Sequence, residues 1–388
     1  MRGVRKVLAG VVVVVACAAG AVLLLRREDE PAKSAQNPLR LGQRTIAFGC
    51  AQRICVQGGE DGTPRTLTAA SGLGDGSPVW SPDGSRIAFL HGVKPARGER
   101  DGRADLYVMD ADGSNRARVA TGLALSPLIL YGPPFAWSPD GTRLAVSLVG
   151  PAPPRPPGPR SKRELFDAAI TGPASDLHVV DLVTRRTRQL TRSTGFDGLP
   201  VWSGDRIVYA RLRRNDPRFR SDVRAVDAAS GDDRPLYSAA GTINLLALAP
   251  DGRRLAIVTG RHGGPGVTAL DLSSGDHEVL VARCCASGLS WSPDGKRMAI
   301  SGIDGPLLSI ADVKAKRLRL TTAALPCLAP DWSPDGSSVI CHRPYGEGDK
   351  QASGSDLVLV DPVTGKRAPV TDTGAAAAAT WRPLGRGS

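Results

Sequence analysis

The sequence lacks the short motifs that mark the common catalytic centres. Its 388 residues contain no P-loop, no G-x-S-x-G nucleophile elbow and no H-E-x-x-H metal-binding helix. The cysteines have no C-x-x-C spacing, which argues against a zinc site. The motifs therefore identify no catalytic residue and no metal ligand, and we expect no cofactor and no metal site.

Aromatic and acidic side chains are also scarce. There are six Trp, five Tyr and six Phe, and 38 Asp and Glu stand against 50 Lys and Arg, which gives a formal net charge of +12. A basic excess favours anionic partners. Nucleic acid is not expected among them, because the basic segments lack the interleaved aromatic residues on which bases stack and the domain is expected to be exported.

Glycine and proline, in contrast, are abundant, with 45 and 31 residues. Both break helix interiors, so their abundance disfavours a helical bundle. The 41% of apolar residues suffices to fill a core. This composition favours an all-β protein with many short strands joined by turns.

The N-terminus carries a single long apolar run, from Val7 to Leu25, without any charge. Nineteen helical residues span about 28 Å, close to the hydrocarbon thickness of a bilayer. The side-chain charge is +3 before the run and −1 just after it, where two Arg and three acids follow. This difference predicts a cytoplasmic tail (1–6), a transmembrane signal-anchor (7–25), a linker (26–44) and an extracytoplasmic domain (45–388).

Two alternatives for this segment stay open. Ala16-Cys17-Ala18 has the small residues of a signal-peptide cleavage site, and Val14-Val15-Ala16-Cys17 loosely matches a bacterial lipobox. All three interpretations export the rest of the chain. We expect a single-pass protein of the cell membrane.

One pentapeptide repeats through the rest of the sequence. Trp80-Ser81-Pro82-Asp83-Gly84 recurs at Trp137, Trp291 and Trp332, with degraded copies at Trp202, Leu248 and Trp381, so all six tryptophans occupy one motif position. Pro, Asp and Gly at these positions are typical of a β-turn. We therefore interpret the aspartates of this motif as turn formers and not as catalytic carboxylates.

A short apolar strand follows each turn, and two further strand-like segments follow it. Four antiparallel strands in every repeat predict the blades of a β-propeller. Residues 45–68 supply three strands without a first one, and residues 376–383 supply a first strand alone. Together these segments predict a composite blade that closes a ring of seven four-stranded blades and removes two sheet edges.

The W-S-P-D-G-x-x-I-A-F pattern, as in Trp80 to Phe89, resembles the TolB-type, WD40-like propeller repeat of exported bacterial proteins. The resemblance covers about residues 45 to 383 and implies the propeller fold. In function it implies a partner-binding scaffold. Such repeats also occur in propellers attached to peptidases and in some lyases, although no second domain remains here for a peptidase.

Six cysteines lie outside the N-terminal apolar run. Cys50 and Cys55 flank a predicted hairpin, and Cys327 and Cys341 lie on adjacent predicted strands, so both pairs are candidates for disulfide bonds. Cys284 and Cys285 are adjacent and either pair with each other or elsewhere. This usage is typical of an oxidising compartment.

Three consecutive repeats carry long, basic connections between their second and third strands. In a propeller these connections share a face with the links between blades, so the sequence predicts one basic sector on one face. Its candidate binding residues are Lys94, Arg97, Arg100, Arg103, Arg155, Arg160, Lys162, Arg163, Arg211, Arg213, Arg214, Arg218 and Arg220. The middle connection is also proline-rich, which indicates a stiff extended segment.

The basic sector predicts docking of an envelope protein or an anionic cell-wall polymer, while a merely solvated surface is the simpler interpretation. The enzyme alternative is a lyase or hydrolase acting on an acidic polysaccharide, with His91, His262 and His342 on the same face. Asp110 to Asn115 has a faint calcium-loop pattern without the distal Glu, and a tight turn explains it. The sequence leaves the oligomeric state open.

Overall fold

The computed structural model divides the chain into two compact units, residues 1–38 and 39–388. The structure describes residues 39–58, 62–70, 73–93, 103–124, 132–150, 174–213, 216, 220–260, 266–282, 286–302, 308–314, 317–320, 326–345 and 354–384. Within these ranges no helix is long and apolar enough to cross a membrane. The predicted signal-anchor at 7–25 lies outside them.

The second unit contains 28 β-strands in its described part, grouped as seven four-stranded blades. Blade 1 consists of β28 (Ala376–Trp381), β1 (Thr45–Cys50), β2 (Arg53–Gly58) and β3 (Arg65–Thr66); blade 2 of β4 (Asp75–Trp80), β5 (Arg86–Val93), β6 (Arg103–Asp110) and β7 (Ala117–Ala124). Blade 3 consists of β8 (Phe135–Trp137), β9 (Arg143–Val149), β10 (Ser175–Asp181) and β11 (Thr187–Gln189); blade 4 of β12 (Phe196–Ser203), β13 (Arg206–Leu212), β14 (Ser221–Asp227) and β15 (Asp233–Ala239).

The remaining three blades have the same order. Blade 5 consists of β16 (Ile243–Leu248), β17 (Arg254–Thr259), β18 (Val267–Asp271) and β19 (His277–Val281); blade 6 of β20 (Gly288–Trp291), β21 (Arg297–Ser301), β22 (Leu308–Asp312) and β23 (Arg317–Leu320). Blade 7 consists of β24 (Leu328–Trp332), β25 (Val339–Tyr345), β26 (Gly354–Val360) and β27 (Arg367–Pro369).

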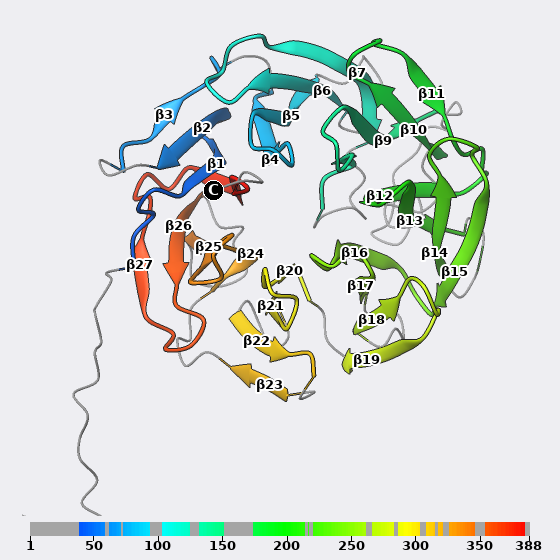
Figure 1. The fold of residues 1–388 in the computed structure, drawn as a ribbon. Coiled ribbons are helices and arrows are strands. Elements are labelled where there is room, and N and C mark those ends of the chain that lie inside the picture. The colour runs from blue at the N-terminus through cyan, green and yellow to red at the C-terminus, as the bar shows by residue number, and fades with distance from the viewer. Residues whose placement is uncertain are drawn as a thin grey trace, which may run out of the picture. The chain divides into compact units, whose positions relative to one another are not determined.

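These blades follow one another around a ring, with first strands such as β4, β16 and β20 toward the centre and fourth strands such as β15, β19 and β23 outside (Figure 1). Neighbouring strands within each blade pair in antiparallel register. The predicted all-β fold of four-stranded antiparallel blades is therefore confirmed.

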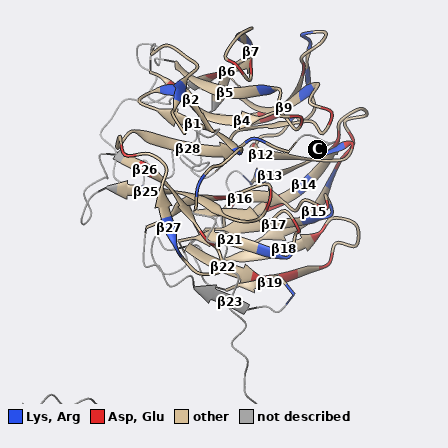
Figure 2. Ribbon diagram, turned by 60° about the vertical axis from the view of Figure 1, so that its left-hand side comes forward, with Lys and Arg blue, Asp and Glu red and all other residues tan. Residues whose placement is uncertain are grey.

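Apolar side chains fill the interfaces between blades. Seven clusters of buried residues occupy the seven contacts between neighbours around the ring. In β5, Ile87 and Phe89 pack toward blade 1, whereas Ala88 and Leu90 pack toward blade 3. Since alternate side chains of a strand point to opposite faces, second strands must be apolar throughout. The charged residues concentrate at strand ends and turns (Figure 2).

The repeated pentapeptide forms the turn between the first and second strands. Ser81 Oγ donates to Asp83 Oδ1 at 2.6 Å and accepts from the Arg86 amide at 2.9 Å, and the same contacts recur at Ser138, Ser292 and Ser333. Gly84 has a positive φ of 67°. The hydrogen bond from Ser81 is the main reason that the pKa of Asp83 falls to about 2. These aspartates are engaged within their own turns.

The turns between third and fourth strands also depend on aspartate. Asp227 Oδ1 accepts from the amides of Ala229 and Ser230, and Asp181, Asp271 and Asp361 make the same pair of contacts. The segment Asp110–Asn115 is such a turn, in which Asp112 Oδ1 accepts from the Ser114 amide at 2.9 Å. Its faint calcium-loop pattern is thus explained by turn formation.

Each tryptophan is covered by an arginine. The guanidinium carbon lies 4.8 to 5.4 Å from the ring centroid in the pairs Arg86–Trp137, Arg143–Trp202, Arg254–Trp291, Arg297–Trp332, Arg44–Trp381 and Arg382–Trp80. In the first four pairs the arginine opens the second strand of the preceding blade. Cation–π contacts of this kind, about 0.5–2 kcal/mol each, link blade to blade.

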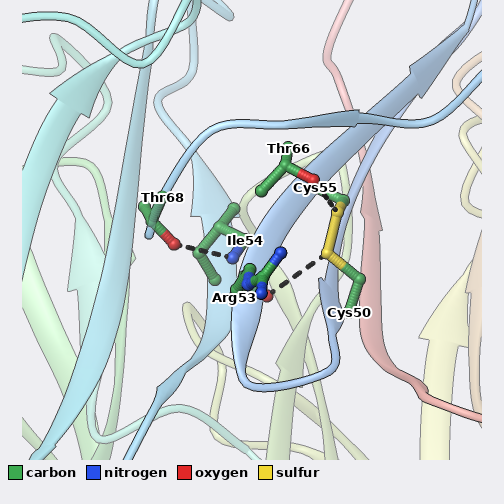
Figure 3. The surroundings of a disulfide bond; sticks show 6 residues. All are labelled: Cys50, Arg53, Ile54, Cys55, Thr66 and Thr68. Carbon is green, nitrogen blue, oxygen red and sulfur yellow. Dashed lines mark hydrogen bonds between the residues drawn. A yellow bond between two sulfur atoms is a disulfide. The ribbon is translucent and has the colours of Figure 1, made fainter. Parts of the chain in front are cut away.

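Blade 1 joins segments from both ends of the described unit. β28 pairs with β1 through Ile46–Trp381 and Ala47–Thr380, and the Arg382 amide donates to Thr45 O. Cys50 and Cys55 form a disulfide across the hairpin of β1 and β2 (Figure 3). Thr68 Oγ1 accepts from the Ile54 amide at 2.9 Å beside it. The second predicted disulfide, Cys327–Cys341, is also formed, so both pairs are confirmed.

Blades 2, 3 and 4 are joined by hydrogen-bonded pairing as well as by packing. Leu123 of β7 pairs with Leu148 of β9, and Ser175 of β10 pairs with Phe196 of β12. These two links combine the three blades into one twelve-stranded sheet, whereas blades 5, 6 and 7 remain separate four-stranded sheets.

Candidate functional site

The connections between second and third strands lie along one edge of the ring. In blades 2, 3 and 4 the strands that frame them pair at Val93–Arg103, Val149–Ser175 and Leu212–Ser221. First strands begin at the same edge, because Asp75 pairs with His91 and Phe196 with Leu212. We call the edge that carries residues 94–102, 150–174 and 213–220 the basic face.

Charge is unevenly distributed along this edge. The three connections of the basic face contain eleven Lys and Arg and five Asp and Glu, whereas the corresponding connections of the other four blades contain two and three. The middle connection extends to residue 174, beyond Arg163, the last of its candidate binding residues. The residues after Arg163 include Glu164 and Asp167, which lower the net positive charge of this connection.

Four of the thirteen predicted binding residues are among the residues that the structure describes. Arg211 lies within β13, Arg213 follows its last residue, Arg220 precedes β14, and Arg103 is the first residue of β6. The remaining members of the set lie outside the described residues, as do His262 and the pair Cys284 and Cys285. They are Lys94, Arg97, Arg100, Arg155, Arg160, Lys162, Arg163, Arg214 and Arg218.

Arg211 is part of an ion pair inside blade 4. Its Nε and Nη2 donate to the two carboxylate oxygens of Asp197 at 2.6 and 2.7 Å, and the Asp197 side chain has no exposed surface. Burial alone would lower the pKa of Arg211, but the hydrogen bonds and charge of Asp197 outweigh it and raise the pKa. Arg211 is thus the counter-ion of a buried carboxylate, and 19% of its own side chain stays exposed.

Arg213 and Arg220 are more exposed and are also paired. Arg213 donates from Nε and Nη2 to Asp222, and Arg220 donates from Nε to Asp216, all at 2.7 Å. Burial would raise the pKa of Asp222, but the contacts of Arg213 and Ser238 hold it below its ordinary value. The arginine side chains remain 41% and 43% exposed. These groups keep a surface-accessible part despite their pairing.

Blade 2 has a second buried carboxylate at the equivalent position. Asp75 Oδ1 lies 2.6 Å from His91 Nδ1 and 3.5 Å from Arg116 Nη2, and the Asp75 side chain is fully enclosed. Both Asp75 and Asp197 open an Asp-Gly-x-Pro-Val-Trp segment with a β-bulge, in which Ser77 and Leu199 have positive φ. That shared hexapeptide was the missed sequence signal for both buried pairs.

His342 lies elsewhere than predicted. It is within β25 at the interface of blades 7 and 1, where it is partly buried, and Nε2 accepts from the Ala379 amide at 3.1 Å. Burial lowers the pKa of His342 to about 4, so the ring is neutral at pH 7. The proposed convergence of three histidines on one face is therefore not formed by His342.

A shallow apolar pocket opens beside the basic face, between blades 4 and 5. It has room for only about one water molecule, and its lining residues are Phe196, Gly198, Leu199, Ala210, Leu212, Ser221, Thr242 and Ile243. Most of them lie in or next to strands β12, β13, β14 and β16 near the edge where the basic connections begin. Arg213 and Arg220 are the chain neighbours of two lining residues, Leu212 and Ser221.

The described residues contain no group of three or more His, Cys, Asp or Glu that is arranged to hold a metal ion. The polar groups that they do offer at this edge include the Asp75–His91 pair, the arginines of blade 4 and the pairs Arg118–Asp105 and Arg343–Asp356.

Comparisons with known proteins agree with the fold. No family model and no curated protein sequence matches the chain. Solved structures do: TolB from Acinetobacter baumannii is 17% identical with a TM-score of 0.51, over 88% of this chain and 67% of that one. An oligogalacturonate lyase in complex with manganese is 14% identical (TM-score 0.53; 84% and 85% covered), and the propeller domain of the Trilobed protease from Pyrococcus furiosus is 13% identical (0.53; 85% and 95%). At these identities the likeness shows a shared β-propeller fold.

Proposed function

We propose that the protein is an exported propeller, tethered to the cell membrane by residues 7–25, that docks an anionic envelope partner on its basic face. The observation that carries the proposal is the charge asymmetry, eleven basic against five acidic residues in three consecutive connections and two against three in the rest. The two disulfides support export, because such bonds persist in oxidising compartments.

The joined blades provide a firm base for this face. The pairs Leu123–Leu148 and Ser175–Phe196 lie at the edge from which the basic connections arise. In addition, the hydroxyls of Ser147 and Ser175 in blade 3 donate to the Asp197 carbonyl of blade 4, at 2.6 and 2.9 Å. Hydrogen bonds between neighbours fix the relative positions of the three blades, and fixed spacing favours recognition of an extended partner.

Retention by isolated cell envelopes tests the proposal. Reversal of Arg155, Arg160, Lys162 and Arg163 to Glu should reduce retention of the full-length protein by about tenfold or more, with the largest difference at low salt. The matched control reverses four exposed cations at the turns of the opposite edge, namely Arg185, Arg186, Arg253 and Lys366. Equal retention of both variants would overturn the docking function.

A second candidate function is a lyase or hydrolase acting on an acidic polysaccharide. The Asp75–His91 contact favours it, because a carboxylate that orients an imidazole is a common arrangement of general bases. The test is release of unsaturated product from oligogalacturonate, followed by ultraviolet absorbance, with His91→Ala compared with His178→Ala. Absence of turnover by the unmodified protein would exclude this activity on that substrate.

A further inference from the structure

The two disulfides differ in how far they are enclosed. Cys50 is only partly buried at the end of β1. Its partner Cys55 is 4% exposed, and Cys327 and Cys341 of the other bond are 2% and 1% exposed. Thiol–disulfide exchange requires a thiolate to reach one of the two sulfur atoms, so access limits its rate. Among these two bonds, Cys50 therefore offers the sulfur that an outside thiolate reaches most readily.

The surroundings of Cys55 favour its departure as the second sulfur. The Thr66 hydroxyl of β3 lies 3.5 Å from Cys55 Sγ and donates to it, because a disulfide sulfur carries no hydrogen (Figure 3). Attack at Cys50 releases Cys55 as a thiolate, and a hydrogen bond to a thiolate lowers its pKa. A thiol of lower pKa leaves faster. The contact with Thr66 thus gives the exchange a direction, with Cys50 attacked and Cys55 released.

The turn that this disulfide closes has an unfavourable backbone. Ala51 and Gln52 form the two-residue turn between β1 and β2, and their φ angles are 47° and 65°. Turns with two positive φ angles usually contain Gly, Asn or Asp, because other side chains crowd the backbone in this conformation. The bond between Cys50 and Cys55 ties together the strands on both sides of the turn and so restrains it.

The same turn is hydrogen-bonded to two other segments of the ring. The Ala51 amide donates to Ala375 O at 3.0 Å, just before β28, and Gln52 O accepts from the Asp75 amide at the start of β4 at 2.9 Å. Ala375 also forms a single parallel bridge with Ser355 of blade 7. The turn therefore connects blade 1 to blade 2 directly and to blade 7 through the residues that precede β28.

We propose that Cys50–Cys55 is a site of thiol–disulfide exchange with a dithiol, and that its reduction releases the starts of β28 and β4. One thiolate of the dithiol attacks Cys50 Sγ, and the bond to Cys55 breaks with its electron pair on Cys55, which takes up a proton. The second thiol then attacks its own sulfur in the mixed disulfide and frees Cys50 as a thiol. The dithiol is oxidised to a disulfide by two electrons, and the protein gains two thiols. This site is independent of docking on the basic face.

Timed reduction of the full-length protein in mild detergent tests the site. Dithiothreitol is the dithiol, free thiols are alkylated at intervals, and peptide mapping by mass spectrometry assigns each cysteine. We expect Cys50 and Cys55 to become alkylated about tenfold or more faster than Cys327 and Cys341. Equal rates, or earlier reduction of Cys327–Cys341, would overturn the proposal.

Thr66 tests the direction of the exchange. Thr66→Val keeps the shape of an exposed side chain but removes its hydroxyl, and it should slow the reduction about threefold. Thr66→Ser keeps the hydroxyl and should restore the rate. If the unmodified protein and both variants are reduced at one rate, Thr66 does not assist the departure of Cys55.

Hydrogen exchange measures the structural consequence. Reduction should speed exchange of the Ala51 and Asp75 amides about tenfold, whereas the amides of β17 in blade 5 should not change and are the internal control. The double variant Cys50→Ser with Cys55→Ser should exchange like the reduced protein and should not respond to dithiothreitol. Unchanged exchange of both amides on reduction would exclude the release of β28 and β4. Where the double variant fails to fold, reduction of the unmodified protein still decides.

Discussion

Blades 2–4 and blades 5–7 share strands, turns and Arg–Trp contacts, yet different interactions join each set to its neighbours. Strands of blades 2, 3 and 4 pair with one another across the blade boundaries, which no described strand of blades 5, 6 and 7 does. Two of the first three blades also bury an aspartate five positions before the motif tryptophan. In blades 5, 6 and 7 the same position holds Ile243, Ala286 and Cys327. At this position a buried carboxylate thus occurs only in the half that carries the basic connections, although blade 7 buries Asp356 on its third strand.

The difference shows where polar groups of the core are tolerated. A buried carboxylate is costly unless it is paired, and His91 and Arg211 provide partners in blades 2 and 4. At the same position in blades 5, 6 and 7, Ile243, Ala286 and Cys327 pack in apolar clusters, and Cys327 is bonded to Cys341. Departures from apolar packing are common near functional sites, in agreement with the position of the basic face.

The largest expected effect comes from the buried pair of blade 4. Arg211→Ala should lower the free energy of unfolding by about 3–5 kcal/mol, because the carboxylate of Asp197 would remain enclosed without its main counter-ion. Urea unfolding followed by circular dichroism measures this loss. Arg118→Ala is the control, since Arg118 is 56% exposed in its pair with Asp105 and should cost about 1 kcal/mol or less. Similar losses in both variants would contradict the comparison.

Removal of the disulfide tests the opposite half. Cys327→Ala with Cys341→Ala should cost about 3 kcal/mol, because the bond closes a loop with a sequence separation of 14. The bond between Cys50 and Cys55, with a separation of 5, should contribute about 2 kcal/mol. Thermal unfolding of the two double variants gives the order. A larger loss at Cys50–Cys55 would show that loop closure is not the main source of stability.

Between pH 6.5 and 4 the interface of blades 7 and 1 should respond through two opposing groups. Burial lowers the pKa of His342 to about 4. Its contribution to the free energy of unfolding is therefore fully present above pH 6.5 and is lost as the pH falls through 4. Burial raises the pKa of Asp331 to about 6, so its contribution is present below about 3.8 and is lost as the pH rises through 6.

Variants separate these two groups, each with an expected range of about 1–3 kcal/mol. His342→Gln keeps an acceptor for the Ala379 amide and should remove the acid-induced loss. Asp331→Asn should remove the opposing gain and make the loss of the unmodified His342 steeper. Urea midpoints at several pH values from 4.5 to 7.5 measure both slopes. If the urea midpoint changes with pH by the same amount in all three proteins, His342 and Asp331 are not the groups responsible.

The smallest effect concerns a contact that both halves share. Arg143→Lys at the interface of blades 3 and 4 and Arg254→Lys at that of blades 5 and 6 should each cost about 1 kcal/mol, because Lys lacks the planar group that stacks on Trp202 or Trp291. Chemical denaturation should give equal losses. A clear inequality would mean that the two halves differ even in their common repeat.

Most of the fold could be predicted from the repeated pentapeptide. Ser81, Pro82, Asp83 and Gly84 interact with one another within a few residues, so their pattern alone indicates the turn. The strand pairing of blade 1 also followed from the missing strands at each end of the repeat array. Both disulfides followed from cysteines on strands that the repeat places side by side.

The candidate site was less predictable because its contacts cross between strands and blades. Arg211 and Arg213 belong to a basic run in the sequence, but their partners Asp197 and Asp222 come from two other strands. His342 follows an apolar segment as His91 does, yet it lies one position earlier relative to the motif and therefore faces the other side of its blade. The face of the strand on which a side chain lies, and not its residue type, determines which partners it meets.

The alanine-rich strand β28 has a consequence for the order of folding. β1 is among the first described strands, but its partner is the last, and Ile46 pairs with Trp381 across nearly the whole domain. Such high contact order makes closure a late step. While the chain is being synthesised, one edge of β1 has no partner, and unpaired edges are open to aggregation. A chain interrupted before Ala376 keeps six complete blades and an open seam, so the arrival of β28 controls when the ring becomes a closed molecule.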